Sequence, residues 1–161
     1  MPEIKNKMIL NLILLFSVFA LIAAYFIQYV LKHQPCNLCL IERIPYFLSI
    51  IVISICLITR KFEKVSLLVL SLIFFSATLI SFYHFGIEQG FIRESLVCDL
   101  NIESNNLSKE ALLNQLKTLS VSCKDVTFKI FGLSLATFNI FISLIFGVIT
   151  TKLFLTYEKN R

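Results

Sequence analysis

Met8 to Leu31 reads MILNLILLFSVFALIAAYFIQYVL, a run of 24 residues without one charged side chain. A helix needs about 20 apolar residues to cross the hydrocarbon layer of a bilayer, so this run predicts a membrane span. Lys5 and Lys7 precede it, as basic residues precede the apolar core of a signal peptide. That core, however, is only about 7 to 15 residues long. The length of the run therefore favours a retained transmembrane helix.

Three more apolar runs follow, at about residues 44–59, 65–85 and 134–156. The run at 44–59 is short, but its helix is expected to begin near residues 39–43, and Pro45 suits the first turn of a helix. Apolar residues make up 57% of the 161-residue chain, against roughly 45–50% in soluble domains. The sequence thus predicts an all-α membrane protein, a bundle of four transmembrane helices that forms a single domain over residues 1–161.

Basic residues gather at one end of the predicted bundle. They are Lys5, Lys7, Arg60, Lys61, Lys64, Lys152, Lys159 and Arg161. Because short loops rich in Lys and Arg stay in the cytoplasm, both termini are predicted to be cytoplasmic. The two extracytoplasmic loops span about residues 32–43 and 86–133, and the second is close to neutral. The net charge of +5 therefore reports topology, and no basic run with interleaved aromatic residues indicates binding of nucleic acid.

Cys36 and Cys39 form a Cys-x-x-Cys pair in the first outer loop. Such a pair can close a small reactive disulfide or supply half of a zinc site, which needs two further ligands. A purely structural bridge is a weaker alternative, because so short a loop restricts the unfolded chain little. On an oxidising outer surface the pattern favours a redox-active disulfide, and no metal is expected.

Cys98 and Cys123 form a second pair in the long outer loop. A single disulfide that braces an extracytoplasmic loop is the common alternative for such a pair. Two pairs at one membrane surface can exchange through a mixed disulfide, however, so all four cysteines are candidate catalytic residues. Cys56, deep in the second span, is expected to be a buried structural residue.

Arg43 and His84 lie at the outer ends of the second and third spans and are candidate binding residues. On a helix, Arg43 would lie close to Cys39, where a guanidinium stabilises a thiolate or an anionic cofactor. A snorkelling arginine and a solvated interfacial histidine are the alternatives. His33 and Glu42 are expected to be loop residues, and Glu88 is expected to be a solvated loop acid.

Electrons that reach the Cys36 and Cys39 pair must leave it again. No glycine-rich nucleotide loop is present in the sequence to bind a soluble electron carrier. The acceptor is therefore expected to dissolve in the membrane, as a quinone does.

Four segments together resemble the disulfide bond formation protein B (DsbB) family. They are Cys36-Asn-Leu-Cys39-Leu-Ile-Glu-Arg43 with Pro45-Tyr46, Tyr83-His84-Phe-Gly86-Ile-Glu88, the pair Cys98 and Cys123, and Gly132-Leu-Ser-Leu-Ala-Thr-Phe-Asn139. The resemblance covers nearly the whole chain and implies a quinone-dependent thiol oxidase of the bacterial inner membrane, active on the periplasmic face. One departure is the absence of Trp, with Phe138 at an aromatic position.

The resemblance also implies roles for the four outer cysteines. Cys98 is attacked by a reduced periplasmic thioredoxin-like oxidase of the DsbA type, and Cys123 passes the exchange on to Cys36. Cys39 then becomes the thiolate that meets the quinone, either ubiquinone or menaquinone.

By the same resemblance Arg43 binds the quinone, with His84 nearby. A metal-handling protein is an alternative, although the sequence shows no Met clusters or intramembrane carboxylates of the kind that a cation pathway needs. A four-span scaffold braced by loop disulfides is another. A vitamin K epoxide reductase-like enzyme is disfavoured, because its loop cysteines are expected before the Cys-x-x-Cys pair.

Overall fold

The part of the chain that the structure describes contains four long helices and one short one. The computed structural model describes residues 2–59, 63–93, 123, 129–130 and 133–159. The long helices are α1 (Pro2–Tyr29), α3 (Ile44–Thr59), α4 (Glu63–Glu88) and α6 (Leu135–Lys159), and the short α2 (Asn37–Ile41) precedes α3. Four segments, one of them made of α2 and α3 together, are long and apolar enough to cross a membrane. The predicted bundle of four transmembrane helices is confirmed.

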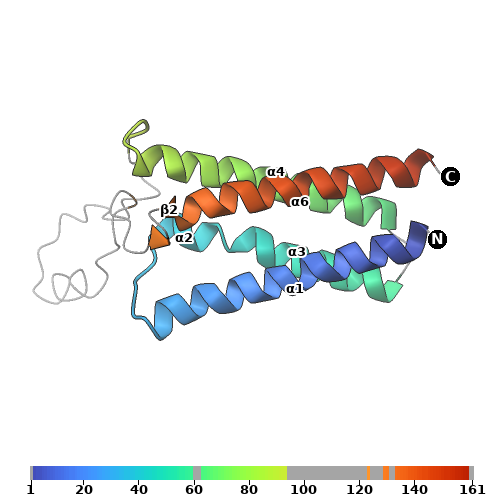
Figure 1. Ribbon diagram of the computed structural model, residues 1–161, viewed down its shortest axis with the longest axis horizontal. Coiled ribbons are helices and arrows are strands. Elements are labelled where there is room, and N and C mark those ends of the chain that lie inside the picture. Colours follow the sequence, from blue (N-terminus) through green and yellow to red (C-terminus); the bar gives the residue numbers. More distant parts are fainter. Residues whose placement is uncertain (1, 60–62, 94–122, 124–128, 131–132, 160–161) are drawn as a thin grey trace, which may run out of the picture.

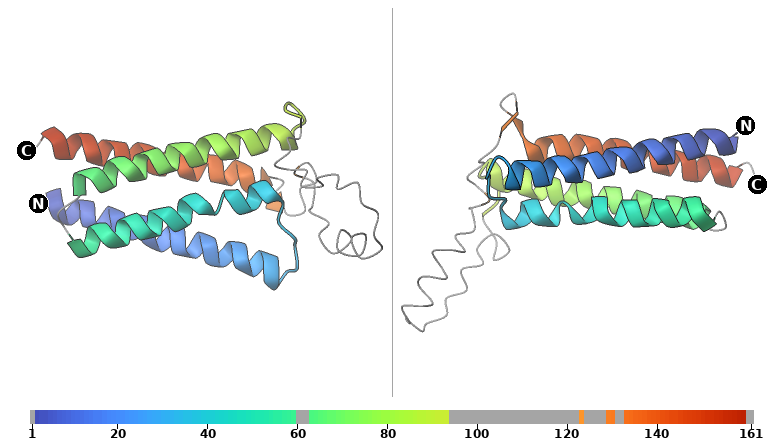
Figure 2. Two further views of the ribbon diagram at one scale, coloured as in Figure 1. Left: turned by 180° about the vertical axis from the view of Figure 1, so that it is seen from behind. Right: turned by 90° about the horizontal axis from the view of Figure 1, so that it is seen from below.

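The long helices run side by side along the axis of the molecule (Figure 1). Helix α4 packs most extensively on α6, and α3 contacts both α1 and α4 (Figure 2). Both termini lie at one end of the bundle, as an even number of spans requires, and α2 and β2 lie at the other end. We refer to these as the terminal end and the thiol end. The assignment of the terminal end to the cytoplasm stays a prediction from the charges.

Pro45 explains why α2 and α3 are separate helices. Helix α2 ends at Ile41 and α3 begins at Ile44. A proline has no N–H to donate, and its ring would collide with the carbonyl group four residues earlier, which here belongs to Ile41. In the first turn of α3 the same residue is well tolerated, because an N–H there has no helical partner. The Cys36 and Cys39 pair therefore has a short helix of its own.

Helix α4 ends in a tight reversal that needs two glycines. Gly90 has a φ of 76°, in the left-handed region that favours glycine. The N–H groups of Phe91 and Ile92 fold back and donate to the Gly86 carbonyl oxygen at 2.9 and 3.1 Å. A Cβ atom on Gly86 would come within 2.6 Å of the Ile92 side chain. The helix thus continues to Glu88, past the predicted end of the span at residue 85.

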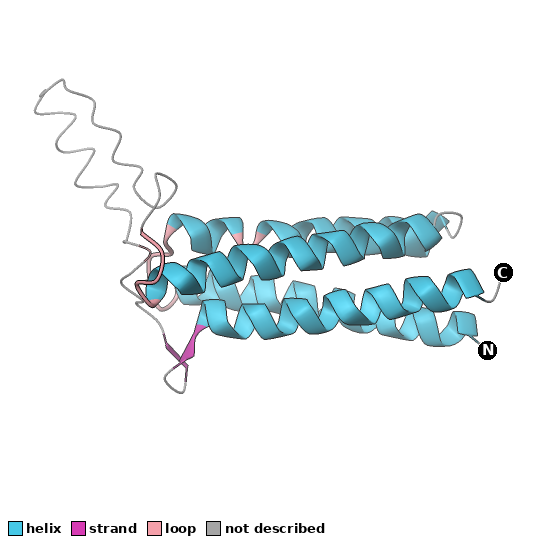
Figure 3. Cartoon of the chain, turned by 90° about the horizontal axis from the view of Figure 1, so that it is seen from above, coloured by secondary structure: helices cyan, strands magenta, loops and turns pink. Residues whose placement is uncertain are grey.

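A small antiparallel hairpin leads into α6 at the thiol end (Figure 3). Its strands are β1 (Lys129–Ile130) and β2 (Leu133–Ser134). The Ser134 hydroxyl accepts a hydrogen bond from the Thr137 N–H at 3.3 Å, as a helix N-cap does. The sequence did not predict this hairpin, because two-residue strands carry too little periodicity to detect.

An apolar cluster fills the half of the bundle nearer the terminal end. It consists of Leu10, Ile13, Ile53, Cys56, Leu67, Leu70 and Phe74. Cys56 is free and only 4% exposed, so the prediction of a buried structural cysteine is confirmed. In the same bundle the buried hydroxyls of Ser17 and Ser49 lie 3.1 Å apart and join α1 to α3, which is typical of helix packing in membranes.

Candidate active site

Cys36 and Cys39 form a disulfide at the thiol end, with their Cα atoms 5.1 Å apart. Cys36 is the N-cap of α2, and its sulfur accepts a hydrogen bond from the Cys39 N–H at 3.2 Å. The two sulfurs differ in access, because Cys36 is buried and Cys39 is only half-buried. The pair therefore has an inner and an outer member.

Cys123 lies in the same apolar cluster as the Cys36–Cys39 disulfide. This cluster contains Cys36, Leu38, Ile87 and Cys123, with Cys39, Ile41 and Tyr83 packed against it. Cys123 is 2% exposed and is itself disulfide-bonded. Cys98 lies outside the described residues, so its predicted pairing with Cys123 stays a prediction. The structure nevertheless brings a cysteine of the long loop next to Cys36, across 86 residues of sequence.

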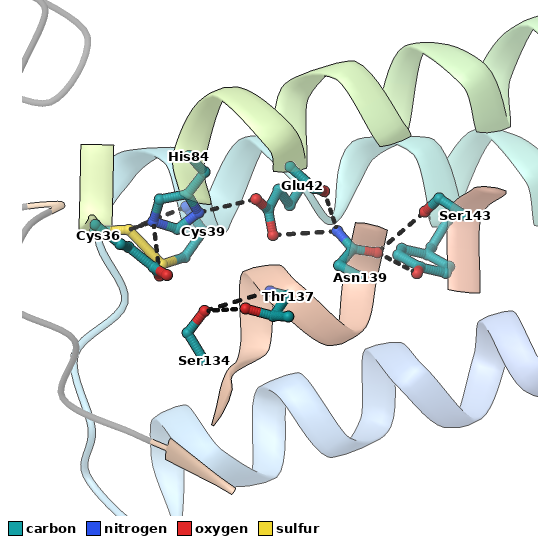
Figure 4. Close-up of polar contacts among 11 residues, drawn as sticks. Cys36, Cys39, Glu42, His84, Ser134, Thr137, Asn139 and Ser143 are labelled. Carbon is teal, nitrogen blue, oxygen red and sulfur yellow. Dashed lines mark hydrogen bonds and ion pairs between the residues drawn. A yellow bond between two sulfur atoms is a disulfide. The ribbon is translucent and has the colours of Figure 1, made fainter. Parts of the chain in front are cut away.

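His84 joins the disulfide to a buried carboxylate (Figure 4). Its Nε2 atom lies 3.5 Å from Cys36 Sγ, and its Nδ1 atom lies 2.8 Å from Glu42 Oε1. A carboxylate accepts hydrogen bonds, so Nδ1 carries the hydrogen, and in the neutral ring Nε2 then presents its lone pair to Cys36. His84 is only 3% exposed. The alternative of a solvated interfacial histidine therefore does not apply to it, and its role as a binding residue stays a prediction.

Glu42 was expected to be a loop residue, and it does lie in the turn between α2 and α3, but it is buried. It caps the C-terminus of α2 and is 8% exposed. Its second oxygen, Oε2, accepts a hydrogen bond from Asn139 Nδ2 at 3.1 Å. Burial is tolerated because both carboxylate oxygens have partners, His84 on one side and Asn139 on the other.

Asn139 on α6 is the centre of this network of hydrogen bonds. The sequence did not predict this role for it. Its Nδ2 also contacts Ser81 Oγ at 2.8 Å. Its Oδ1 accepts hydrogen bonds from the Tyr46 hydroxyl and, at 3.2 Å, from the Ser143 hydroxyl. An amide in an otherwise apolar span is itself a signal of function, because polar groups inside a membrane are costly. We call Cys36, His84, Glu42 and Asn139 the polar chain.

Glu88 completes the site, and the expectation that it is a solvated loop acid was wrong. It is the last residue of α4, one turn after His84, and its side chain is 5% exposed. Its Oε1 atom lies 3.6 Å from His84 Nε2. The other oxygen, Oε2, is buried and has no hydrogen-bond partner among the residues that the structure describes. The spacing of four residues from His84 on one helix was the available signal.

Arg43 lies in the break between α2 and α3 and is tied to α1. Its guanidinium donates to Gln28 Oε1 at 2.6 Å and stacks over the Tyr25 ring at 5.0 Å. The helical spacing that predicted its approach to Cys39 is interrupted at residues 42–43. Its assignment as a binding residue stays a prediction.

Comparison with known proteins agrees with this geometry. The family model described as disulfide bond formation protein DsbB matches residues 6–153. The chain belongs to the DsbB family. It is also 30% identical, over 155 residues, to an uncharacterized protein of Rickettsia prowazekii (strain Madrid E), covering 94% of this chain and 90% of that one.

Membership of the DsbB family establishes the general class of activity. The chain is a multi-pass membrane protein and a disulfide oxidoreductase that takes part in disulfide formation in the membrane. The disulfide at Cys36 and Cys39 is the described pair suited to that chemistry.

Proposed function

We propose that this DsbB-family protein oxidises a reduced thioredoxin-like partner of the DsbA type in the periplasm and passes the electrons to quinone in the bacterial inner membrane. The observation that carries the proposal is the shared cluster of Cys123 with the Cys36–Cys39 disulfide. It supports direct exchange between a loop cysteine and the membrane-end pair. The position of the site opposite the termini supports a periplasmic location, since Lys7, Lys64 and Lys152 lie toward the terminal end.

The proposed exchange begins at the second cysteine pair. A thiolate of the partner attacks Cys98, and Cys123 leaves as a thiolate. Cys123 then attacks Cys36, and Cys39 leaves as a thiolate. The second thiolate of the partner then attacks the partner's own sulfur that is bonded to Cys98, and Cys98 leaves as a thiolate. Cys98 attacks Cys123, and Cys36 leaves. Each step breaks one S–S bond and forms another, so in sum the partner loses two electrons and the Cys36 and Cys39 pair gains them.

His84 acts at Cys36 in this proposal. For the Cys36–Cys39 bond to form again, the Cys36 thiol must lose its proton, and the lone pair of His84 Nε2 is the base at 3.5 Å. Glu42 holds Nδ1–H and thereby fixes the ring and stabilises its positive charge after the transfer. This places His84 at the inner sulfur of the pair, in addition to its predicted position near the quinone.

Cys39 and Arg43 fit a quinone at the outer sulfur. Cys39 is the more accessible member of the pair. Arg43 offers guanidinium N–H groups beyond the one that donates to Gln28, and these suit a carbonyl oxygen. Leu40 and Ile44 nearby are exposed apolar residues, as expected of a surface that an apolar ring reaches from lipid. A bound quinone supplies a two-electron acceptor.

The test measures quinone reduction by the purified protein with a reduced thioredoxin-like dithiol as the electron donor. The loss of quinone absorbance monitors the reaction. We expect turnover in the unmodified chain and none in Cys36→Ser or Cys39→Ser. Replacement of Cys56 by Ser in the same assay is the matched control, because this cysteine lies in the apolar cluster. Full turnover in either active-site variant would sink the proposal.

A further inference from the structure

The thiol end carries a set of side chains with the composition of a zinc site. The sulfurs of Cys36 and Cys39 and a ring nitrogen of His84 all lie within 4.8 Å of one another. Two thiolates and an imidazole are the ligands that Zn²⁺ and Cd²⁺ prefer. A structural zinc site needs four ligands, so these three atoms alone leave one position to fill.

Glu88 supplies the fourth position. Its Oε1 lies 3.6 Å from His84 Nε2, and its side chain is 5% exposed. Its Oε2 has no hydrogen-bond partner among the described residues, although such buried oxygens normally have one. Glu88 therefore has a buried carboxylate oxygen free to bind a cation, on a side chain that contacts His84.

The groups behind His84 also match those of a zinc site. A metal-ligating histidine usually donates its second N–H to a carboxylate, which fixes the ring with the other nitrogen toward the metal. Glu42 accepts from Nδ1 at 2.8 Å, and Asn139 in turn holds Glu42 at 3.1 Å. The ring is thus oriented with Nε2 toward the sulfur of Cys36.

We propose that the reduced form of the protein binds one Zn²⁺-like cation through Cys36, Cys39, His84 and Glu88. In the oxidised form the two sulfurs are bonded to each other and are not thiolate ligands. Reduction of the disulfide adds two electrons and two protons. The cation then displaces the two thiol protons, and no electron moves in that step.

The consequence is a site that opens only when the Cys36–Cys39 pair is reduced. A thiolate bound to a cation is not free to form the disulfide again, so the cation holds the protein in its reduced form. This inference requires only that the pair be reducible. It does not depend on the identity of the electron acceptor.

The experiment measures Zn²⁺ binding by the full-length protein in detergent. A variant in which Cys98 and Cys123 are replaced by Ser leaves the proposed site as the only outer thiols. After anaerobic reduction and removal of the reductant, Zn²⁺ is titrated against a chromophoric chelator, and Co²⁺ is added to a second sample. We expect one Zn²⁺ per reduced chain, none in the oxidised chain, and intense thiolate-to-Co²⁺ absorption. Equal binding in the oxidised chain, or no binding in the reduced chain, overturns the inference.

Variants distinguish this site from simple chelation by two thiols. His84→Ala and Glu88→Gln are expected to weaken Zn²⁺ binding strongly. Glu42→Gln, which disturbs only the support of His84, is expected to weaken it by about 10- to 100-fold. Glu63→Gln, at the other end of α4, is the matched control and should bind Zn²⁺ as the parent does. Unchanged affinity in both His84→Ala and Glu88→Gln overturns the inference, since the thiols alone would then account for binding.

Discussion

Cys36 and Cys56 are buried to nearly the same degree, yet the groups around their side chains differ in polarity. Cys36 is 5% exposed and Cys56 is 4% exposed. Cys56 packs in the apolar cluster with neighbours such as Ile53 and Phe74. The Cys36 sulfur instead meets the imidazole of His84 and the N–H of Cys39. Burial therefore does not distinguish these two cysteines, and the polar groups around the Cys36 sulfur do.

The same contrast holds between the two halves of the bundle. The half nearer the termini is held by apolar packing and by a hydrogen bond between the hydroxyls of Ser71 on α4 and Thr151 on α6. The thiol end carries the polar chain, which links α2, α4 and α6 through hydrogen bonds. Polar side chains in a membrane raise the free energy of the folded protein unless each has a hydrogen-bond partner. This cost is a physical reason to expect a function for the polar chain.

The first prediction removes the base beside Cys36. His84→Ala is expected to lower kcat for quinone reduction by about 10²- to 10⁴-fold, the usual contribution of a general base. The measurement is steady-state turnover with a reduced thioredoxin-like dithiol. His33→Ala, which changes the other histidine of the chain, is the control and should retain the parent kcat. An unchanged kcat in His84→Ala would show that Cys36 needs no base there.

The second prediction acts on the support of that base. Asn139→Leu removes the hydrogen bond to Glu42 Oε2 and is expected to lower kcat about tenfold, the equivalent of roughly 1.4 kcal/mol. Because Asn139 acts through Glu42 and His84, the pH profile of kcat should shift as well. Asn139→Gln keeps an amide and should recover part of the loss. A loss of folded protein with a normal rate per folded molecule would assign Asn139 a purely structural role.

Much of the fold was predictable from the sequence, for a definite physical reason. A span must be about 20 apolar residues long, whatever it packs against, so the runs at 8–31, 65–85 and 134–156 were visible directly. Pro45 likewise acts through its own ring and marked the start of α3. These signals are local, and local signals can be read from a single sequence.

The polar chain was not predictable in the same way. Glu42 is 42 residues from His84 and 97 from Asn139, and its burial depends on meeting both of them. No periodicity of the sequence records such a meeting, so the sequence predicts only that Glu42 lies in a loop and that Glu88 is a solvated acid. The cysteine pair was recognisable because its two residues are only three positions apart in the sequence and so lie close together in space.

The third prediction concerns the outer member of the cysteine pair. Arg43→Ala is expected to raise KM for quinone about fivefold, corresponding to a hydrogen bond of roughly 1 kcal/mol, with a smaller effect on KM for the protein partner. Gln28→Leu removes one of the two contacts that Arg43 makes with α1 and leaves its charge in place, so it should change KM less. Equal increases in both KM values would count against a quinone site at Arg43.

The smallest effect is expected in the apolar cluster. Cys56→Ala should leave kcat and both KM values unchanged and lower the free energy of unfolding by about 1 kcal/mol, because it removes a small buried group. Thermal unfolding in detergent and the turnover assay measure the two quantities. Any clear loss of turnover per folded molecule would contradict the contrast between Cys36 and Cys56.

The position of the two termini has a practical consequence for work with this protein. Helix α6 has 25 residues and so is about 37 Å long, and it separates the C-terminus from the thiol end. An affinity tag or a fluorescent reporter fused at either terminus is therefore kept away from the reactive sulfurs. The same reporter, if it fluoresces only in the cytoplasm, would also determine the orientation of the whole bundle in a living cell.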